Sequence, residues 1–288
     1  MAIIGAGRVG TTLAVLLEGA GHPIVMASGR ESSRARARRY LPSTPFFGLE
    51  AAPASARSAE LVVLAVPDDA LADVCLGLAD GGAFVARQLV MHTSGSIGLD
   101  VLAPAAAAQA EILSVHPLQA FPDVEDGIAR LPGSHIAVTA RTAKAVAAGE
   151  SIARDLGGHP FRLPEDAKAL YHAGAVFASN YLVATIAIAE ELLGRAGLER
   201  ARDLLGPLAR AVLEETLDEG PGGALTGPAA RGETETVARH LGALWQRAPD
   251  AVEPYVALAR VAARVASLDG RLAEDQRARL EEELTRWR

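Results

Sequence analysis

Residues 3–10 read Ile3-Ile4-Gly5-Ala6-Gly7-Arg8-Val9-Gly10, a G-x-G-x-x-G turn. Three glycines at this spacing let a strand turn tightly into a helix, let the backbone approach a pyrophosphate, and let the helix pack closely. An apolar run at residues 2–4 precedes the turn, and an apolar-rich run at 11–17 follows it, as the motif requires. The stretch therefore predicts a dinucleotide-binding fold. The residues expected at the cofactor are Gly5, Gly7, Arg8, Val9 and Gly10.

The composition describes a globular chain with an acidic balance. The sequence has 288 residues, 50% of them hydrophobic, and a formal net charge of −7. This length allows two ordinary domains. The negative charge argues against nucleic acid as the main partner. The one cysteine, Cys75, excludes an intramolecular disulfide and a cysteine-based zinc site, and we expect no metal.

We expect a cytoplasmic protein, because the nucleotide motif occupies the N-terminus where a signal peptide would lie. The most apolar run, residues 173–189, carries Asn180 and is bracketed by charged and polar side chains. It predicts a buried helix of a soluble protein in preference to a membrane span.

Strand-like and helix-like segments alternate in the first half, which is typical of a parallel sheet with crossover helices. The predicted strands are 2–4, 23–27, 61–65, 89–92, 111–116 and 135–139, with an edge strand at 160–163, and the predicted helices are 11–20, 30–40, 69–79, 99–108 and 140–156. From Glu165 onward helical periodicity dominates. Helices are predicted at 166–193, 198–217, 234–246, 249–267 and 272–287, with a flexible turn at 220–223. We expect an α/β domain at 1–164 and an all-α domain at 165–288.

The end of the second strand favours NADP(H) over NAD(H). An NAD-binding fold usually carries Asp or Glu there to bind the ribose 2′-hydroxyl. This chain has Ala27-Ser28-Gly29-Arg30 instead. The Ser28 hydroxyl and the Arg30 guanidinium suit a 2′-phosphate, and Arg34 lies one helical turn further on. The alternative is that these arginines form a solvated helix face.

Polar residues follow three strands at the carboxyl edge of the sheet, where open α/β sheets bind ligands. Val66 and Pro67 are expected to form a wall beside the cofactor, with Asp69 capping the next helix. Ser94, a catalytic candidate, and Ser96 follow the next strand, where their hydroxyls could bind a substrate carboxylate or hydroxyl. The alternative is helix N-capping by Ser96 or Thr93.

His116 precedes Pro117 at the end of a further strand. A histidine there is a candidate proton donor or acceptor beside a hydride transfer, because its pKa lies near working pH. The alternative is a structural histidine.

The helical domain opens with Lys168-Ala169-Leu170-Tyr171-His172. Positions i and i+4 share a helix face, so Lys168 and His172 are expected to point together into an interdomain cleft. There they would polarise a substrate carbonyl and protonate the developing alkoxide. A solvated first-turn lysine is the alternative for Lys168.

Three further residues are weaker substrate candidates. Asn180 lies in the apolar run and is alternatively a satisfied buried amide. Thr226 and Arg231 lie in a Gly/Pro-rich loop at 225–232, where Arg231 could face an anionic substrate and Thr226 could instead cap a helix.

The glycine turn, the His116-Pro117 step, the Lys168-x-x-Tyr171-His172 helix and Leu225-Thr226-Gly227-Pro228 together resemble a Rossmann-like family of unknown function. Its members are regarded as NADP oxidoreductases. The resemblance covers essentially the whole chain and implies a Rossmann-type domain followed by a helical domain like that of 6-phosphogluconate dehydrogenase. It also implies a homodimer built on the helical domain.

Relatives in that superfamily include β-hydroxyacid dehydrogenases, ketopantoate reductase, pyrroline-5-carboxylate reductase and prephenate dehydrogenase. Lys168 matches the lysine of the K-x-x-x-N motif found in the first two, although His172 replaces its asparagine. Ser94 and His116 look like the serine and histidine that prephenate dehydrogenases use, although the surrounding motifs differ.

The sequence therefore favours an NADP(H)-dependent oxidoreductase. Its expected substrate is a small carboxylate-bearing carbonyl, imine or alcohol. Two alternatives stay open, a prephenate-type oxidative enzyme and a non-catalytic module that senses NADPH.

Overall fold

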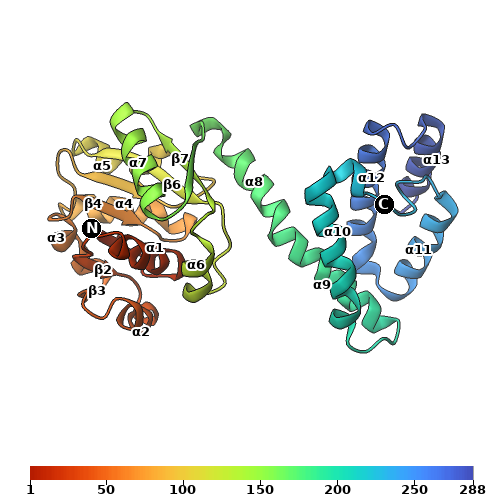
Figure 1. The fold of residues 1–288 in the computed structure, drawn as a ribbon, viewed down its shortest axis with the longest axis horizontal. Helices are drawn as coiled ribbons and strands as arrows, with labels where there is room; N and C mark the ends of the chain where they lie inside the picture. Colours follow the sequence, from red (N-terminus) through yellow and green to blue (C-terminus); the bar gives the residue numbers. More distant parts are fainter. Residues whose placement is uncertain (288) are drawn as a thin grey trace. The chain divides into compact units, whose positions relative to one another are not determined.

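The computed structural model describes residues 1–287 of the chain (Figure 1). Its contacts divide the chain into two compact units, Met1–Ser179 and Asn180–Arg288. The first unit is built on a mixed, mostly parallel sheet, and the second is helical throughout its described residues. This architecture confirms the predicted fold class.

Eight strands form the sheet of the first unit, in the order β3-β2-β1-β4-β5-β6-β7-β8. They are β1 Ala2–Ile4, β2 Met26–Ser28, β3 Phe46–Phe47, β4 Leu61–Leu64, β5 Leu89–His92, β6 Glu111–Pro117, β7 His135–Ala140 and β8 His159–Arg162. The order reverses at β1, which pairs with β2 on one side and β4 on the other. Ligands of such sheets bind outside the carboxyl ends of the strands at this reversal.

The sequence predicted a parallel sheet, but one pair of strands runs antiparallel. β6 and β7 pair antiparallel, with Val115 opposite Val138. The connection between them carries α6 (Val124–Arg130), which packs against α1 (Arg8–Gly19) instead of crossing over the sheet, so β7 enters from the opposite end. The elements β3, α3 (Ala52–Ala56) and α6 have no counterpart among the predicted elements.

Helices cover both faces of the sheet in Figure 1. They are α1 Arg8–Gly19, α2 Glu31–Tyr40, α3 Ala52–Ala56, α4 Asp68–Asp80, α5 Ala103–Ala107, α6, α7 Ala143–Asp155 and α8 Lys168–Ala178. Successive residues of a central strand enter opposite cores: Ile3 packs with Leu13 and Leu113, and Ile4 packs with Leu64 and Leu71. A strand buried on both faces has a continuous apolar sequence, which explains the short unbroken runs seen here.

The second unit has its own apolar core. Its helices are α9 Asn180–Arg195, α10 Ala201–Ala224, α11 Thr234–Arg247, α12 Val252–Leu268 and α13 Glu274–Thr285. Val237, Leu241, Val256, Leu280 and Leu284 are buried among α11, α12 and α13. In contrast, α9 has no buried residue and α10 buries only Ala224.

The helix predicted at 166–193 is interrupted. Ser179, with φ −126° and ψ −77°, separates α8 from α9, and a short 3-10 turn at Glu165–Ala167 precedes α8. By its contacts α8 belongs to the sheet unit, so the two compact units are divided after Ser179. The functional domain boundary expected after residue 164 stays a prediction. The turn predicted at 220–223 is a kink at Gly220, with φ 80°, after which α10 continues to Ala224.

The prediction that residues 173–189 form a buried helix is wrong for the single chain. One helical stretch among the described residues, Glu165–Arg195, is long and apolar enough to cross a membrane, and none of its apolar window is buried. Only Ile188 and Leu192 of α9 pack against the core of the second unit. The remaining apolar side chains of α9 lie at the surface of this unit.

Candidate functional site

In the turn between β1 and α1, two of the three glycines have no room for a side chain and one has. Gly5 has φ +99°, and a Cβ there would lie 2.5 Å from the Ala65 carbonyl oxygen. A Cβ at Gly10 would lie 2.2 Å from the Gly5 carbonyl oxygen. A Cβ at Gly7 would meet nothing within 4 Å. The first and third glycines therefore serve the fold, whereas the second leaves space beside the first turn of α1.

Ser28, at the end of β2, closes the other side of this turn. Its carbonyl oxygen accepts hydrogen bonds from the N–H groups of Gly5 (2.9 Å) and Ala6 (2.8 Å). Its side chain is fully buried, and its hydroxyl has no partner among the described residues. Val66 lies against the turn, because its Cγ1 would lie 2.9 Å from a Cβ at Gly5, and its role beside the cofactor stays a prediction. Pro67 is exposed and forms the N-cap of α4.

The arginines of α2 differ in their surroundings. Arg30 is exposed and is the N-cap residue of α2. Arg34 pairs with Glu31 at 2.7 Å and stacks over Phe46, so its charge is already partnered. Arg36, which the sequence reasoning did not single out, donates a hydrogen bond from Nη1 to the Ala6 carbonyl oxygen at 3.4 Å. Basic side chains thus flank the glycine turn, although Arg34 is not free to bind a phosphate. Arg8 is exposed at the start of α1, and Val9 packs against the core.

Lys168, the first residue of α8, is buried at the carboxyl edge of the sheet. Only 1% of its surface is exposed. Nζ donates to the Ser94 carbonyl oxygen and to Ser114 Oγ, each at 2.9 Å. The alternative of a solvated first-turn lysine is therefore excluded. An ammonium has three N–H donors, and the third has no hydrogen-bond partner among the described residues.

His116, at the end of β6, lies against two aromatic side chains of α8. Its Nδ1 is 2.9 Å from Tyr171 Oη, and its ring makes an edge contact with His172 at 5.8 Å between centroids. Gly95 makes this approach possible, because a Cβ there would lie 2.7 Å from His116 Nε2 and 2.6 Å from His172 Cδ2. Lys168, Tyr171 and His172 therefore converge on the sheet edge from one helix.

Ser94 and Ser96 hold a carboxylate. Both hydroxyls donate to Asp68 Oδ2, at 2.9 and 2.7 Å. Ser94 Oγ also accepts the N–H groups of Ser96 and Ile97, which orders the loop after β5. The alternative of helix capping by Ser96 or Thr93 is wrong, because Gly98 is the N-cap residue of the 3-10 helix that follows. Asp69 does not cap α4 with its side chain, and the neighbouring Asp68 contacts the serines instead.

Burial sets the protonation states of the cluster. Desolvation lowers the pKa of Lys168 to about 8, with the Asp68 and Glu165 carboxylates acting in the opposite direction. Desolvation, reinforced by the Lys168 and His172 charges, lowers the pKa of His116 to about 4. Burial raises the pKa of Tyr171 to about 12. At neutral pH Lys168 is mostly an ammonium, whereas His116 and Tyr171 are uncharged.

The remaining candidates lie in the second unit. Asn180 is exposed and not a buried amide. Arg231 is exposed and pairs with Glu233 at 2.7 Å, and Thr226 lies in a turn that ends α10 without capping a helix through its side chain. Their roles toward a substrate stay predictions.

Three members of the cluster were missed or given no role. No role was predicted for Asp68 or Gly95, and Tyr171 was used only as part of the Lys168-x-x-Tyr171-His172 motif. One sequence signal favours a functional role for Lys168: the chain contains two lysines, Lys144 and Lys168, among 28 lysine and arginine residues. Because almost all basic side chains of the chain are arginines, a lysine at the start of a helix is unusual here.

The residues around the glycine turn fit a dinucleotide. The open position at Gly7 accommodates phosphate oxygens beside the N-terminus of α1. The unpartnered Ser28 hydroxyl and the exposed Arg30 lie at the end of β2, where such folds recognise the adenosine ribose. Among residues 1–287 there is no group of three or more side chains suited to hold a metal ion.

The chain matches two family models and several solved structures. Residues 1–117 match a Rossmann-like domain, and residues 134–262 match a domain of unknown function, DUF2520. The structure is similar to BF3122 from Bacteroides fragilis, named as a candidate NADP oxidoreductase, with 24% identity, a TM-score of 0.76, and 91% of this chain and 97% of that chain covered.

It is also similar to TM1727 from Thermotoga maritima, with 20% identity, a TM-score of 0.70, and 94% and 99% of the two chains covered. A reductive aminase from Aspergillus terreus in complex with NADPH and ethyl levulinate matches with 20% identity and a TM-score of 0.59, over 99% and 92% of the chains. No curated protein matches the sequence. At these identities the TM-scores establish a shared fold and no more. The chain thus carries a match to a Rossmann-like domain followed by a match to DUF2520.

Proposed function

We propose that this protein is an NADP(H)-dependent oxidoreductase that transfers a hydride to or from a small carboxylate-bearing carbonyl, imine or alcohol. One observation carries the proposal: a buried ammonium, Lys168, lies with His116 and Tyr171 at the carboxyl edge of the sheet that also bears the open glycine turn. The similar fold of a reductive aminase complexed with NADPH supports the cofactor class.

In the proposed mechanism, Lys168 stabilises negative charge and His116 transfers the proton. Bound NADP(H) would supply or accept the hydride. Lys168 is held by Ser94 and Ser114, and its third N–H is left to bind a substrate oxygen. In a low-dielectric site, such a donor stabilises negative charge that develops on that oxygen.

The proton would move through His116. If Tyr171 donates its hydroxyl proton to Nδ1, the neutral imidazole carries its own proton on Nε2, on the side of Gly95 and His172. His116 then gives the Nε2 proton to the substrate while Nδ1 takes the Tyr171 proton, and water reprotonates Tyr171, whose side chain is only partly buried. Oxidation runs the same path backwards. Ser94 and Ser96 orient Asp68, whose carboxylate balances the Lys168 charge.

The experiment measures NADPH oxidation and NADP⁺ reduction by the purified full chain against 2-oxo acids, cyclic imines, hydroxy acids and a cyclohexadienyl acid. We expect turnover with a carboxylate-bearing carbonyl or imine, and its loss in Lys168→Met and His116→Gln. His22→Gln is the matched control, because His22 pairs with Asp155 outside the cluster. Turnover of the cyclohexadienyl acid alone would instead support a prephenate-type enzyme. Tight NADPH binding with no turnover of any substrate would support a sensor module.

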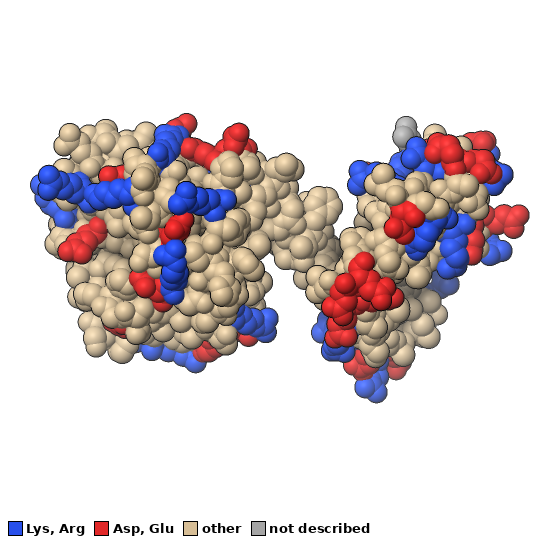
Figure 2. Space-filling view, turned by 45° about the horizontal axis from the view of Figure 1, so that its top comes forward, with Lys and Arg blue, Asp and Glu red and all other residues tan. Residues whose placement is uncertain are grey.

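We further propose a cytoplasmic homodimer that forms through the helical unit. The exposed apolar side chains of α9 and α10, among them Val183, Leu204, Leu208 and Leu217, need a partner surface. Nucleic acid is a poor candidate partner. On the face seen in Figure 2, acidic and basic side chains are interspersed and do not gather into a basic surface.

A further inference from the structure

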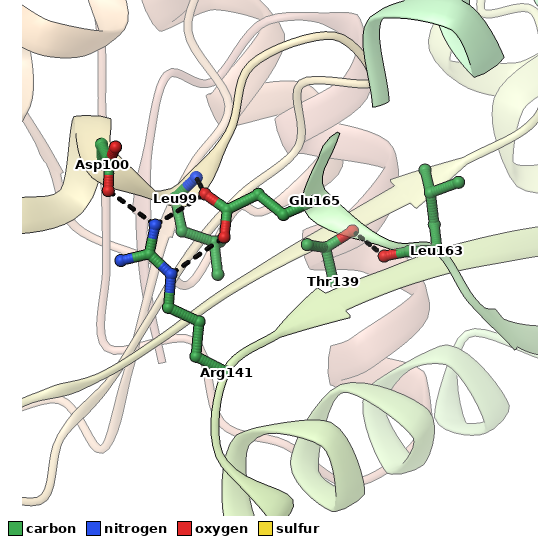
Figure 3. Close-up of polar contacts among 6 residues, drawn as sticks. All are labelled: Leu99, Asp100, Thr139, Arg141, Leu163 and Glu165. Atoms are coloured by element: carbon green, nitrogen blue, oxygen red, sulfur yellow. Dashed lines mark hydrogen bonds and ion pairs between the residues drawn. The ribbon is translucent and has the colours of Figure 1, made fainter. Parts of the chain in front are cut away.

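Arg141, which follows β7, binds the Glu165 carboxylate through two guanidinium nitrogens (Figure 3). Its Nε donates to Oε2 at 2.9 Å and its Nη2 to Oε1 at 2.8 Å. Nη2 also donates to Asp100 at 2.6 Å. Bidentate guanidinium–carboxylate pairs fix orientation as well as distance. The Glu165 side chain is therefore held in one position against the end of the sheet.

Glu165 reaches the loop that carries Ser94 and Gly95. Its Oε1 accepts the backbone N–H of Leu99 at 2.7 Å, as Figure 3 shows. Gly98 makes room for this contact, because a Cβ there would lie 2.9 Å from Glu165 Oε1. Thr139 Oγ1 donates to the Leu163 carbonyl oxygen at 2.8 Å, which ties the segment before Glu165 to β7. The far end of the 94–98 loop is thus attached to the start of the helical segment.

The same loop and the same helix meet a second time at Lys168. Glu165 begins the 3-10 turn that leads into α8, and Lys168 is the first residue of α8. Lys168 Nζ donates to the Ser94 carbonyl oxygen, at the near end of the loop. Two charged side chains, three residues apart in the chain, thus hold the loop at both ends.

We propose that Glu165, oriented by Arg141, is a positioning residue that sets where Lys168 and the Ser94–Gly95 backbone lie relative to His116. Its importance for turnover rests on the proposed function, whereas its effect on Lys168 does not. The Arg141–Glu165 ion pair fixes the segment that leads into α8. A free first turn of α8 would let the buried ammonium leave the two oxygens that compensate its desolvation.

Glu165 also contributes charge to the site. The titratable groups that act on Lys168 from the surrounding elements are Asp68 on α4, His92 on β5, His116 on β6 and Glu165 itself. His92 and His116 are neutral at pH 7, since their pKa values are lowered to about 3 and about 4. The two carboxylates are therefore the groups that favour the ammonium, and loss of Glu165 lowers the pKa of Lys168.

The test uses the two lysines of the chain. Acylation of the full-length protein with acetic anhydride from pH 6 to 10, read by mass spectrometry, gives the titration midpoint of Lys168, with the exposed Lys144 as internal reference. The variants are Glu165→Ala, which removes both contacts, and Glu165→Gln, which keeps an oxygen for Leu99 but removes the charge. Glu150→Gln is the control, because Glu150 also accepts from two arginines but lies outside the cluster.

We expect the Lys168 midpoint to fall in both Glu165 variants, by enough to raise its acylation rate at pH 7 about threefold or more, since half a pKa unit is a factor of about three. The plateau rate at high pH, which reports exposure, should rise in Glu165→Ala and much less in Glu165→Gln. With an active substrate, kcat should fall about tenfold in Glu165→Ala, while the KM for NADPH stays unchanged because the glycine turn is untouched.

An unchanged Lys168 midpoint and plateau in Glu165→Ala, matching Glu150→Gln, would overturn the positioning role. That result could coexist with turnover that depends on Lys168, in which case the proposed function would stand. Conversely, a shifted midpoint in a protein that turns over no substrate would keep the positioning role and remove the proposed function. Exposed ion pairs contribute only about 0–1 kcal/mol to stability, so the variants should fold.

Discussion

Lys168 is the side chain on which the chemistry of this site depends. It is the only lysine of the chain in the interior, and it has two hydrogen-bond acceptors but no carboxylate within hydrogen-bond distance among the described residues. The lowered pKa, about 8 against 10.5, corresponds to a net cost of about 3 kcal/mol for the charged form, in which desolvation outweighs the favourable Asp68 and Glu165 charges. Side chains with strongly perturbed pKa values cluster at functional sites, where a ligand interacts with the charge.

The first prediction concerns pH. If the Lys168 ammonium binds the developing negative charge, its acid form is the active form. Since its pKa is about 8, kcat/KM for reduction should be constant below about pH 7 and should fall about tenfold per unit above pH 8. Lys168→Met should remove turnover and change the free energy of unfolding by less than about 2 kcal/mol, because desolvation relief offsets two unsatisfied acceptors. Activity that rises through pH 8 would contradict this assignment, and thermal unfolding checks the stability.

The second prediction concerns the cofactor preference. Arg30 is exposed at the N-cap of α2 and is free to pair with a 2′-phosphate, whereas Arg34 is held by Glu31. Arg30→Ala should weaken NADPH binding about tenfold or more and leave NADH binding within about twofold, as measured by fluorescence titration. Arg34→Ala is the matched control and should have the smaller effect. An equal loss for both dinucleotides would remove Arg30 from 2′-phosphate recognition.

At the scale of elements, the three glycines of the β1–α1 turn have different roles: the fold requires Gly5 and Gly10, whereas Gly7 leaves space for a ligand. Gly5 has a positive φ and Gly10 touches the Gly5 carbonyl, so both are needed whether or not a cofactor is bound. Gly7 has φ −76°, which any residue adopts, and has free space at its Cβ position. The motif spacing alone does not reveal this difference.

The third prediction follows from that difference. Gly7→Ala should leave the melting temperature within about 2 °C of the wild type and weaken NADPH binding about tenfold or more, because the new methyl group occupies the space beside the first turn of α1. Gly10→Ala should lower the melting temperature sharply, because its Cβ would lie 2.2 Å from a backbone oxygen. Differential scanning fluorimetry with and without NADPH checks both. Unimpaired NADPH binding by Gly7→Ala would place the pyrophosphate elsewhere.

At the scale of the whole molecule, the two units bury their apolar residues differently. The sheet unit is buried on both faces of its strands, whereas α9 and α10 leave large apolar side chains in contact with solvent. Leu208 and Leu217 are 62% and 75% exposed. Such helices are stable in water only when another surface covers them.

The fourth prediction is the oligomeric state. Analytical ultracentrifugation of the full chain should give about twice the 29.9 kDa mass of one chain. Leu208→Glu combined with Leu217→Glu should produce monomers, because it buries two charges in an apolar interface. Leu258→Glu, on α12 and 50% exposed, should leave the dimer intact. A monomeric wild type that sediments with lipid vesicles would show that the apolar helices bind a membrane instead.

Local sequence patterns were sufficient for much of this protein. The glycine turn, the alternation of strands and helices, the change to an all-helical second half and most strand positions follow from short-range spacing and periodicity, which are properties of neighbouring residues. The 2′-phosphate that the end of β2 indicates stays a prediction, because it rests on the residue types at that position alone. The antiparallel β7 was missed, because the packing of α6 against α1 decides it, and the break at Ser179 has no signal in the local sequence pattern.

Only the tertiary structure decided how the candidate site is assembled. Lys168 contacts Ser94 and Ser114, which lie 74 and 54 residues away in the chain, and His116 meets Tyr171 across 55 residues. No local pattern encodes such pairs, because they form when separate strands and one helix are brought to the same edge of the sheet. The sequence by itself determined the fold class and the glycine turn. Burial in the folded chain determined that Lys168 carries a perturbed charge and that Asp68, Gly95, Tyr171 and Glu165 surround it.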